Sequence, residues 1–238
     1  AEKINCGSAL IFGSESGDID FLINTAKKLK DIKINNTNKD ITFAKARENA
    51  LGFSFSSPND ILATEYINNL QKLSPVAIKR GDFESASEIR KRISGFNYDE
   101  FYKIAFGILK RLDKSDFALL PDISEGIENR IYDSIRFSAS YEEMLATAKT
   151  KRYTMARIKR LCLYAVLGLT KTEYDKPIDY VRILGMNNKG LEILNLMKEK
   201  SKIPFGTELK DEFESRCTDL YEMNKPSGSD YRERVIKI

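Results

Sequence analysis

The chain has 238 residues, 42% of them hydrophobic, so it can bury one large core or two smaller ones. Its 39 basic and 35 acidic residues nearly balance, and the absence of histidine excludes His-based triads, imidazole general bases and the commonest metal ligand. The three cysteines lie far apart in the sequence and form neither a disulfide framework nor a zinc-binding spacing. No apolar run reaches the about 20 residues that a membrane helix needs. We therefore expect a globular, cytoplasmic protein without a metal site of its own.

The first predicted unit is a strand, a glycine turn and a helix. Residues 8–12 read as a short buried strand, Gly13-Ser-Glu-Ser-Gly-Asp18 forms the turn, and an amphipathic helix follows. In α/β proteins such a turn lies at the carboxyl end of a strand, where backbone N–H groups can receive phosphate. Taken alone, the turn is better explained structurally, with Gly13 and Gly17 supplying backbone freedom between strand and helix.

A second set of short elements extends to residue 94. The predicted elements are a helix at 41–50, a helix entered through Pro58, a strand at 75–80 and a helix at 83–93. Asn59 or Asp60 can cap the second of these helices, although an Asn there can also bind a base or ribose edge. A strand that ends in Arg80, followed by a helix bearing Arg90, makes a plausible anion pocket.

Nearly everything after residue 95 is predicted to be helical. The expected helices are 99–111, 123–137, 141–150, 155–168, 187–199 and 208–223. A short extended segment interrupts them at 180–185, and a polar tail begins at Pro226. We therefore predict an α/β part over residues 1–94 followed by a mainly α-helical domain over residues 95–238.

One stretch of the helical domain is strongly basic. Seven Lys or Arg residues and no Asp or Glu lie between Met144 and Thr172. Thr154 can cap a helix with an apolar face of Met155, Ile158, Cys162, Ala165 and Leu169, and an opposite face of Arg157, Arg160 and Tyr164. The opposite face can bind a polyanion such as RNA, or it can simply be the solvated side of a core helix. The stretch alone leaves both interpretations open.

Seven short motifs carry a resemblance to a known family. They are Phe12-Gly-Ser-Glu-Ser-Gly-Asp18, Ser57-Pro-Asn-Asp-Ile-Leu62 with Glu65-Tyr66, Ile78-Lys-Arg80, Ser85-Ala-Ser-Glu-Ile-Arg90, Glu125-Gly-Ile-Glu-Asn-Arg130, Lys149-Thr-Lys-Arg-Tyr-Thr154 with Arg157, and Arg182-Ile-Leu-Gly185. In this order, over almost the whole chain, they resemble the tRNA(Met) cytidine acetate ligase family. The resemblance implies a partial Rossmann-like nucleotidyltransferase domain that uses ATP, with Mg²⁺, to activate acetate as acetyl-adenylate. The acetyl group would then pass to N4 of the wobble cytidine of elongator tRNA(Met).

The resemblance also implies two sets of site residues. The positions expected to bind ATP are Gly13, Asn59, Arg80, Ser87 and Arg90. Those expected to face tRNA are Lys149, Lys151, Arg152, Tyr153, Arg157 and Arg160, with the arginines and lysines on phosphates and the tyrosine ring stacked on a base. No catalytic base is implied.

The sequence departs from the family pattern at two places. The family opens with a strand and a His-x-Gly-His-like loop that grips the triphosphate, whereas this sequence has no histidine, so we expect that segment to be missing. A longer loop is also expected between the strand at 75–80 and the next helix, where this chain has only Gly81-Asp-Phe83. Two alternatives therefore remain, a tRNA-binding module without chemistry and a small-molecule adenylyltransferase.

Overall fold

The chain divides into two compact units. The computed structural model describes residues 2–31, 43–81, 84, 88–89, 92, 96–208, 211–223, 228 and 235–237. The first unit comprises Ala1–Ile93, Tyr180–Thr207 and Val235–Ile238, and the second comprises Ser94–Asp179 and Glu208–Arg234. A break close to residue 94 is also what the sequence predicts, but the sequence assigns 180–207 to the helical domain. No helix within the described ranges is both long enough and apolar enough to cross a bilayer.

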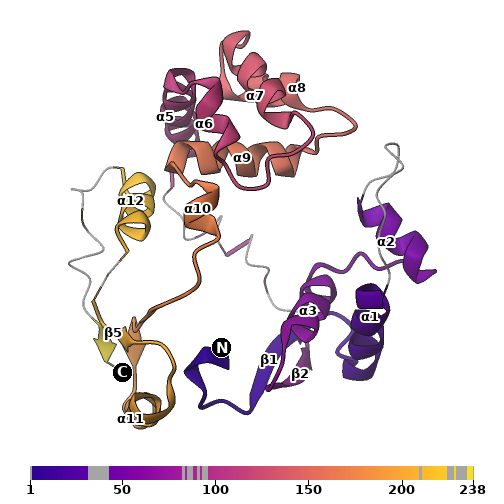
Figure 1. Ribbon diagram of the computed structural model, residues 1–238, viewed down its shortest axis with the longest axis vertical. Coiled ribbons are helices and arrows are strands. Elements are labelled where there is room, and N and C mark those ends of the chain that lie inside the picture. The colour runs from indigo at the N-terminus through magenta and orange to yellow at the C-terminus, as the bar shows by residue number, and fades with distance from the viewer. Residues whose placement is uncertain are drawn as a thin grey trace. The chain divides into compact units, whose positions relative to one another are not determined.

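Two parallel strands form the centre of the first unit (Figure 1). Its N-terminal elements are η1 (Glu2–Ile4), β1 (Ala9–Ser14), α1 (Ile19–Asp31), α2 (Phe43–Leu51), α3 (Pro58–Asn69) and β2 (Ser74–Lys79). The register of β1 and β2 places Gly13 opposite Ile78, next to the carboxyl end of both strands. Helices α1 and α3 pack on each other and on the sheet face that carries Phe12, where Leu22 and Ala63 complete a small core.

The turn between β1 and α1 requires glycine at one position. Gly17 has φ +68°, and a Cβ atom there would lie 2.6 Å from the Cβ of Lys79 on β2. Both the left-handed backbone and the close approach exclude other residues. Directly after it, the Asp18 carboxylate accepts a hydrogen bond from the Phe21 N–H at 2.9 Å and so begins α1.

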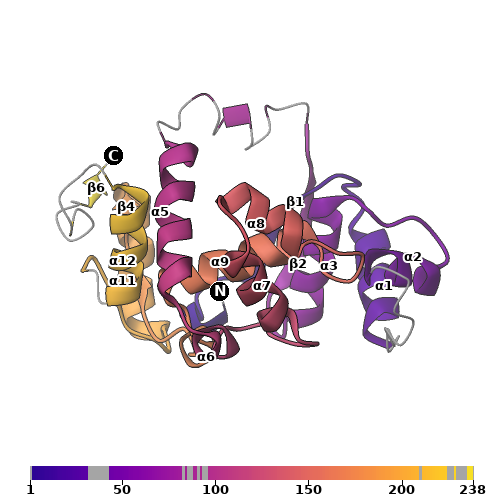
Figure 2. The same cartoon turned by 90° about the horizontal axis from the view of Figure 1, so that it is seen from above.

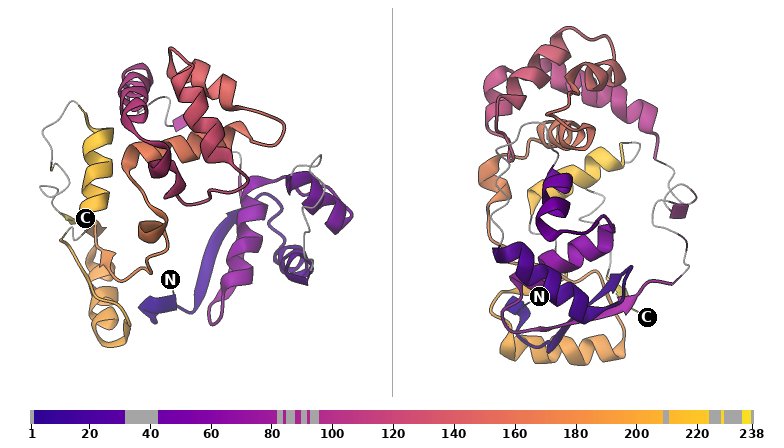
Figure 3. Two further views of the ribbon diagram at one scale, coloured as in Figure 1. Left: turned by 45° about the horizontal axis from the view of Figure 1, so that its top comes forward. Right: turned by 90° about the vertical axis from the view of Figure 1, so that its right-hand side faces the viewer.

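The other described residues of the first unit, within 180–207 and 235–238, form two very short strand pairs and a helix, which are coloured orange to yellow in Figure 3. Strand β3 (Val181–Arg182) pairs in parallel with β5 (Phe205–Gly206), and β4 (Gly185–Met186) pairs in parallel with β6 (Ile236–Lys237). Helix α11 (Asn188–Lys200) contacts β4. The prediction of a polar tail from Pro226 is therefore wrong for β6, which finds a partner some 50 residues earlier in the chain.

The second unit is a helical bundle (Figure 2). Its helices are α5 (Tyr98–Arg111), α6 (Lys114–Ala118), α7 (Ile127–Arg136), α8 (Tyr141–Ala148), α9 (Met155–Leu167), α10 (Lys171–Tyr174) and α12 (Glu212–Tyr221). Helix α7 packs on α6 and α8, and α9 packs on α5 and α8. Their shared core includes the fully buried side chains of Leu109, Phe117, Ile131, Ile158 and Leu161.

Helix α7 begins four residues later than the sequence predicts. The preceding loop contains three left-handed residues, Asp122 (φ 62°), Glu125 (φ 62°) and Gly126 (φ 81°), which a helix cannot contain. Side chains cap both of the next two helices, and the cap of α9 is the one that the sequence predicts. Ser140 accepts from the Glu143 N–H at the start of α8, and Thr154 accepts from the Arg157 N–H at the start of α9. This loop and the start of α9 together form the basic site described below.

Candidate functional site

Gly13 and Arg80 lie side by side at the carboxyl edge of the parallel strands. The Arg80 N–H donates to the Ser14 carbonyl at 2.9 Å, which extends the pairing of β1 and β2 by one bond. A Cβ atom on Gly13 would lie 3.3 Å from Cγ of Arg80, so the glycine leaves room for the arginine stem. Both residues are exposed. In open α/β sheets, ligands commonly bind at the carboxyl ends of the strands.

Asn59 is joined to the same edge through Glu15. The Glu15 carboxylate accepts from Nδ2 of Asn59 at 2.6 Å, from the Asn59 N–H at 3.3 Å and from the Asp60 N–H at 3.0 Å. A side chain from the β1–α1 turn therefore caps α3 from outside, with its negative charge at the positive end of that helix. The residue in the N-cap position is Ser57, whose side chain makes no cap hydrogen bond. The expectation that Asn59 or Asp60 caps this helix is therefore wrong.

Asp60, at the start of α3, makes the reciprocal contact with the β1–α1 turn. Its carboxylate accepts from Oγ of Ser14 at 2.5 Å and from the Ser16 N–H at 3.2 Å and 3.3 Å. Only 4% of Asp60 is exposed, so its carboxyl oxygens depend on those donors for hydrogen bonds. The Gly17 N–H in turn donates to Oγ of Ser14 at 2.9 Å. The β1–α1 turn and the start of α3 thus form one interlocked unit.

The electrostatics of Glu15 follow from this interlock. Partial burial of the carboxyl acts to raise its pKa, but the hydrogen bonds from Asn59 and Asp60 outweigh burial and hold the pKa of Glu15 below its ordinary value. Glu15 is therefore ionised at neutral pH and serves as an acceptor. Its charge also fixes the Asn59 amide as a donor toward Glu15.

The other two positions expected to bind ATP, Ser87 and Arg90, lie outside the described residues. The described ranges contain no group of three or more His, Cys, Asp or Glu residues that could hold a metal ion. Of the five positions expected to bind ATP, the structure thus brings three together at the carboxyl edge of β1 and β2. Gly13 and Arg80 are adjacent there, and Asn59 is joined to this edge through Glu15.

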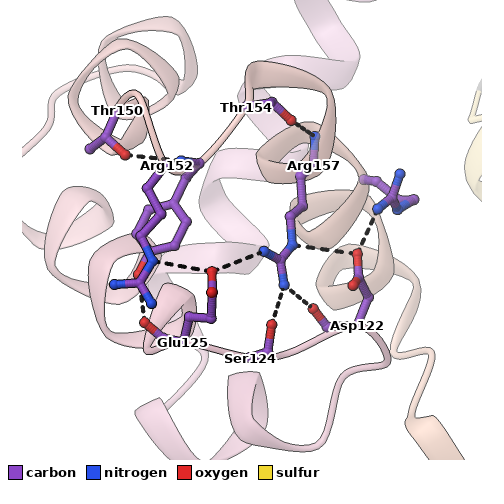
Figure 4. Close-up of polar contacts among 9 residues, drawn as sticks. Asp122, Ser124, Glu125, Thr150, Arg152, Thr154 and Arg157 are labelled. Carbon is purple, nitrogen blue, oxygen red and sulfur yellow. Dashed lines mark hydrogen bonds and ion pairs between the residues drawn. The ribbon is translucent and has the colours of Figure 1, made fainter. Parts of the chain in front are cut away.

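Three arginines of the basic stretch bind the loop before α7 (Figure 4). Arg157 is the central residue, because its Nη2 donates to the Asp122 carbonyl at 2.9 Å and to Oγ of Ser124 at 2.6 Å. Its Nε lies 3.5 Å from Oδ2 of Asp122, and its Nη1 lies 3.9 Å from Oε2 of Glu125. Only 19% of the Arg157 side chain is exposed. These contacts make it a clamp on the loop.

Two further arginines are more open. Arg152 donates from Nε to Oε2 of Glu125 at 3.1 Å, and Arg160 donates from Nη2 to Oδ2 of Asp122 at 2.6 Å. Their side chains are 44% and 47% exposed. Guanidinium groups on this surface therefore share two carboxylates that the basic stretch itself does not contain.

Tyr153 does not have the surroundings that base stacking requires. Its ring is only 8% exposed and belongs to the core of the helical unit. Its hydroxyl donates to the Glu125 carbonyl at 2.6 Å, so the residue anchors the loop before α7. A ring in the core has no free face for a base, and the structure does not support the expected stacking role.

Three lysines complete the basic surface. Lys149, Lys151 and Lys159 are exposed, and none of them makes an ion pair with a carboxylate of the described residues. Their charge is open to solvent and to a polyanion. The sequence predicts every cation of this surface as a site residue except Lys159. It gives no sign that Asp122, Ser124 and Glu125 are the partners of the three arginines.

Comparison with known proteins covers both units. The family described as HIGH Nucleotidyl Transferase matches residues 1–100 and 82–233. The tRNA(Met) cytidine acetate ligase of Clostridium tetani is 32% identical to this chain over 90% of the chain and 70% of the relative. The enzyme of the same name from Thermoanaerobacter sp. X514 is 30% identical over 100% of the chain and 78% of the relative.

A solved structure gives the same result for the fold. The chain resembles Thermotoga maritima TmcAL, crystallised with alpha-thio ATP, with a TM-score of 0.83 at 24% identity over 100% of this chain and 78% of that one. This similarity confirms the expected fold class, an α/β part combined with a mainly helical part. The family match and the curated relatives establish that the chain belongs to the tRNA(Met) cytidine acetate ligases of the HIGH nucleotidyltransferase family.

Proposed function

We propose that the protein is an ATP-dependent, cytoplasmic RNA-modifying ligase that acetylates N4 of the wobble cytidine in elongator tRNA(Met). The observation that carries the proposal is the relationship to tRNA(Met) cytidine acetate ligases over nearly the whole chain at 30–32% identity. The acetate oxygen would attack the α-phosphorus of ATP and release pyrophosphate. The cytidine N4 amine would then attack the acyl carbon of the acetyl-adenylate and release AMP.

The carboxyl edge of β1 and β2 is the proposed ATP-binding region. Arg80 is exposed there, and Gly13 has no side chain to obstruct a phosphate group next to it. We assign Arg80 to a phosphate and Gly13 to close approach of the nucleotide. Because the described residues offer no carboxylate cage, Mg²⁺ would arrive bound to the triphosphate. Ser87 and Arg90 remain proposed ATP-binding residues on the basis of the family motif.

Asn59 has a more specific proposed role. Its Nδ2 already donates to Glu15, so the amide is oriented before any ligand binds. Its carbonyl oxygen is then the group that we expect to face a donor of the nucleotide, such as a ribose hydroxyl. Glu15 would act on ATP binding only through Asn59 and the turn that it holds.

The helical unit is the proposed tRNA surface. Lys149, Lys151, Arg152 and Arg160 are exposed and would neutralise backbone phosphates. Arg157 would mainly shape the surface, since most of its side chain is buried against the loop before α7. Tyr153 is proposed to contribute to binding only through that same loop.

One observation favours a second function, tRNA binding without chemistry. The alignment with the Thermoanaerobacter relative extends over 312 positions, although the chain has 238 residues, so at least 74 aligned positions have no counterpart here. The two family matches also overlap at residues 82–100, beside the point where the family motif predicts a longer loop. A chain without the phosphate-gripping loop of the family pattern would lack donors that stabilise charge on the transferring phosphates.

A binding experiment separates the two functions. Calorimetry with ATP should give saturable binding for the ligase, weakened in Arg80→Ala without a change in melting temperature. The matched control is Lys72→Ala, an exposed cation just before the opposite, amino end of β2. Undetectable ATP binding, combined with saturable binding of tRNA, would support the tRNA-binding module without chemistry.

A further inference from the structure

The carboxylates of Asp122 and Glu125 bind two arginines of the proposed tRNA surface. Arg152 holds Glu125 and Arg160 holds Asp122, each through one carboxylate oxygen. Carboxylate and phosphate oxygens are alternative acceptors for the same guanidinium donors. In the free protein, the two carboxylates therefore accept hydrogen bonds from the same guanidinium groups that would bind tRNA phosphates.

The loop is bent so that these two acids meet the arginines. Asp122 and Glu125 both have φ 62°, a backbone conformation that residues other than glycine seldom adopt. Such conformations persist only where surrounding contacts determine them, and they are concentrated at functional sites. Arg157 and Tyr153 supply those contacts through the Asp122 and Glu125 carbonyl groups.

Hydrogen bonds to the loop backbone and to Ser124 hold the loop without the two carboxylates. Arg157 also pairs with both acids, with its Nε 3.5 Å from Oδ2 of Asp122 and its Nη1 3.9 Å from Oε2 of Glu125, and these two pairs would remain when a phosphate binds Arg152 or Arg160. The pairs of Arg152 and Arg160 are instead solvent-exposed, with all four side chains between 44% and 48% accessible. Exposed ion pairs of this kind are weak, so a phosphate can replace the carboxylate without opening the loop.

We propose that Asp122 and Glu125 are internal counterions of the RNA-binding surface, which orient Arg152 and Arg160 in the free protein and are displaced by backbone phosphates when tRNA binds. The inference rests on the proposed tRNA-binding function. In this arrangement the acids keep the two arginines in place and lower the affinity for polyanions in general. A phosphate that binds must first compete with a carboxylate already present.

The test is titration of an elongator tRNA(Met) transcript against Asp122→Asn and Glu125→Gln at several salt concentrations. Both substitutions preserve the backbone carbonyl that holds the loop, and Asn readily adopts the left-handed backbone of position 122. Loss of one negative charge near a phosphate should tighten binding by about threefold at low salt. The gain should shrink as salt rises, because screening weakens the repulsion that was removed.

Asp99→Asn is the matched control. Asp99 is an exposed carboxylate of the same unit, in the first turn of α5 and 23 residues before Asp122 in the chain. It should leave tRNA affinity unchanged. An equal gain in this control would attribute the effect to net charge alone and overturn the proposal.

The remaining outcomes are equally decisive. Unchanged or weaker binding by both Asp122→Asn and Glu125→Gln, while Lys151→Ala lowers the salt dependence, would refute the counterion role and leave the tRNA surface intact. No tRNA binding by the unmodified protein would refute the proposed function and the counterion role with it. If the melting curve shows that one of the two variants is unfolded, the tRNA affinity of the other variant decides between the counterion role and its refutation.

Discussion

Removal of the Glu15 carboxylate should destabilise the first unit more than its position in a surface turn suggests. Glu15 accepts three hydrogen bonds from the start of α3, including the N–H groups of Asn59 and Asp60. Loss of a charged cap at a helix N-terminus costs about 1 kcal/mol. Loss of the bond from Nδ2 of Asn59 adds about 1 kcal/mol, at the low end for a charged acceptor because the site is partly exposed. Glu15→Ala should therefore cost about 2 kcal/mol.

Urea unfolding followed by circular dichroism would measure this cost. Asp18→Ala is the matched control, because Asp18 caps α1 through a single hydrogen bond to the Phe21 N–H and should cost about 1 kcal/mol. Glu15→Gln keeps an acceptor oxygen without the charge and should fall between Glu15→Ala and the unmodified protein. A cost for Glu15→Ala no greater than that of Asp18→Ala would refute the interlock as a source of stability.

The same carboxyl gives this prediction a pH dependence. The pKa of Glu15 is lower in the folded protein than its ordinary value of 4.5, so the carboxylate stabilises the fold at pH values above 4.5. This contribution disappears as the pH falls through the lowered, folded-state pKa. The difference in stability between the unmodified protein and Glu15→Gln should therefore be constant near neutral pH and shrink in acid. A difference that grows in acid would contradict the hydrogen-bonding pattern of Glu15.

Substitutions at three other positions test further contacts of the structure. Gly17→Ala should cost about 2 kcal/mol or more in urea unfolding, because its Cβ would meet Lys79 at 2.6 Å and its φ is +68°; a cost under about 0.5 kcal/mol would contradict this geometry. Asn59→Asp would bring a second carboxylate to Glu15, so its melting temperature should lie below that of Asn59→Ala at pH 7 and converge with it in acid; the reverse order would contradict the contact. Tyr153→Phe should cost about 1 kcal/mol for the lost hydroxyl bond, and Tyr153→Ala about 3–5 kcal/mol for the lost core ring; equal costs would mean that the ring is not packed as described.

The sequence predicted those parts of the fold that local pattern determines. Long amphipathic helices such as α5 and α9 were predicted within one residue at each end, and Thr154 was correctly identified as a cap. Helices α6 and α10 were missed because five and four residues are too few to display a helical period. The short strand β6 was missed because its partner β4 lies far away in the chain and imposes no pattern on it.

Prediction of the candidate sites was limited in the same way, because local sequence does not show contacts between distant segments. The cations of the basic stretch were visible as a local excess of charge, but their acidic partner Asp122 precedes Arg157 by 35 residues and Arg160 by 38. Glu15 and Asn59 appeared in separate motifs, and nothing in either motif indicates that the two side chains meet. Tyr153 was expected at the surface because it stands among cations, whereas its ring fills the core. Contacts between distant segments determine all of these features.

Nucleoside analysis of a tRNA transcript tests the central claim most directly. The protein would be incubated with ATP, Mg²⁺, labelled acetate and an unmodified elongator tRNA(Met) transcript, and the digested RNA would be examined for N4-acetylcytidine by mass spectrometry. The proposed function predicts one labelled acetylcytidine per transcript, dependent on ATP and absent when the wobble cytidine is replaced by uridine. A transcript that binds the protein tightly but remains unacetylated would contradict the ligase and leave a tRNA-binding protein in its place.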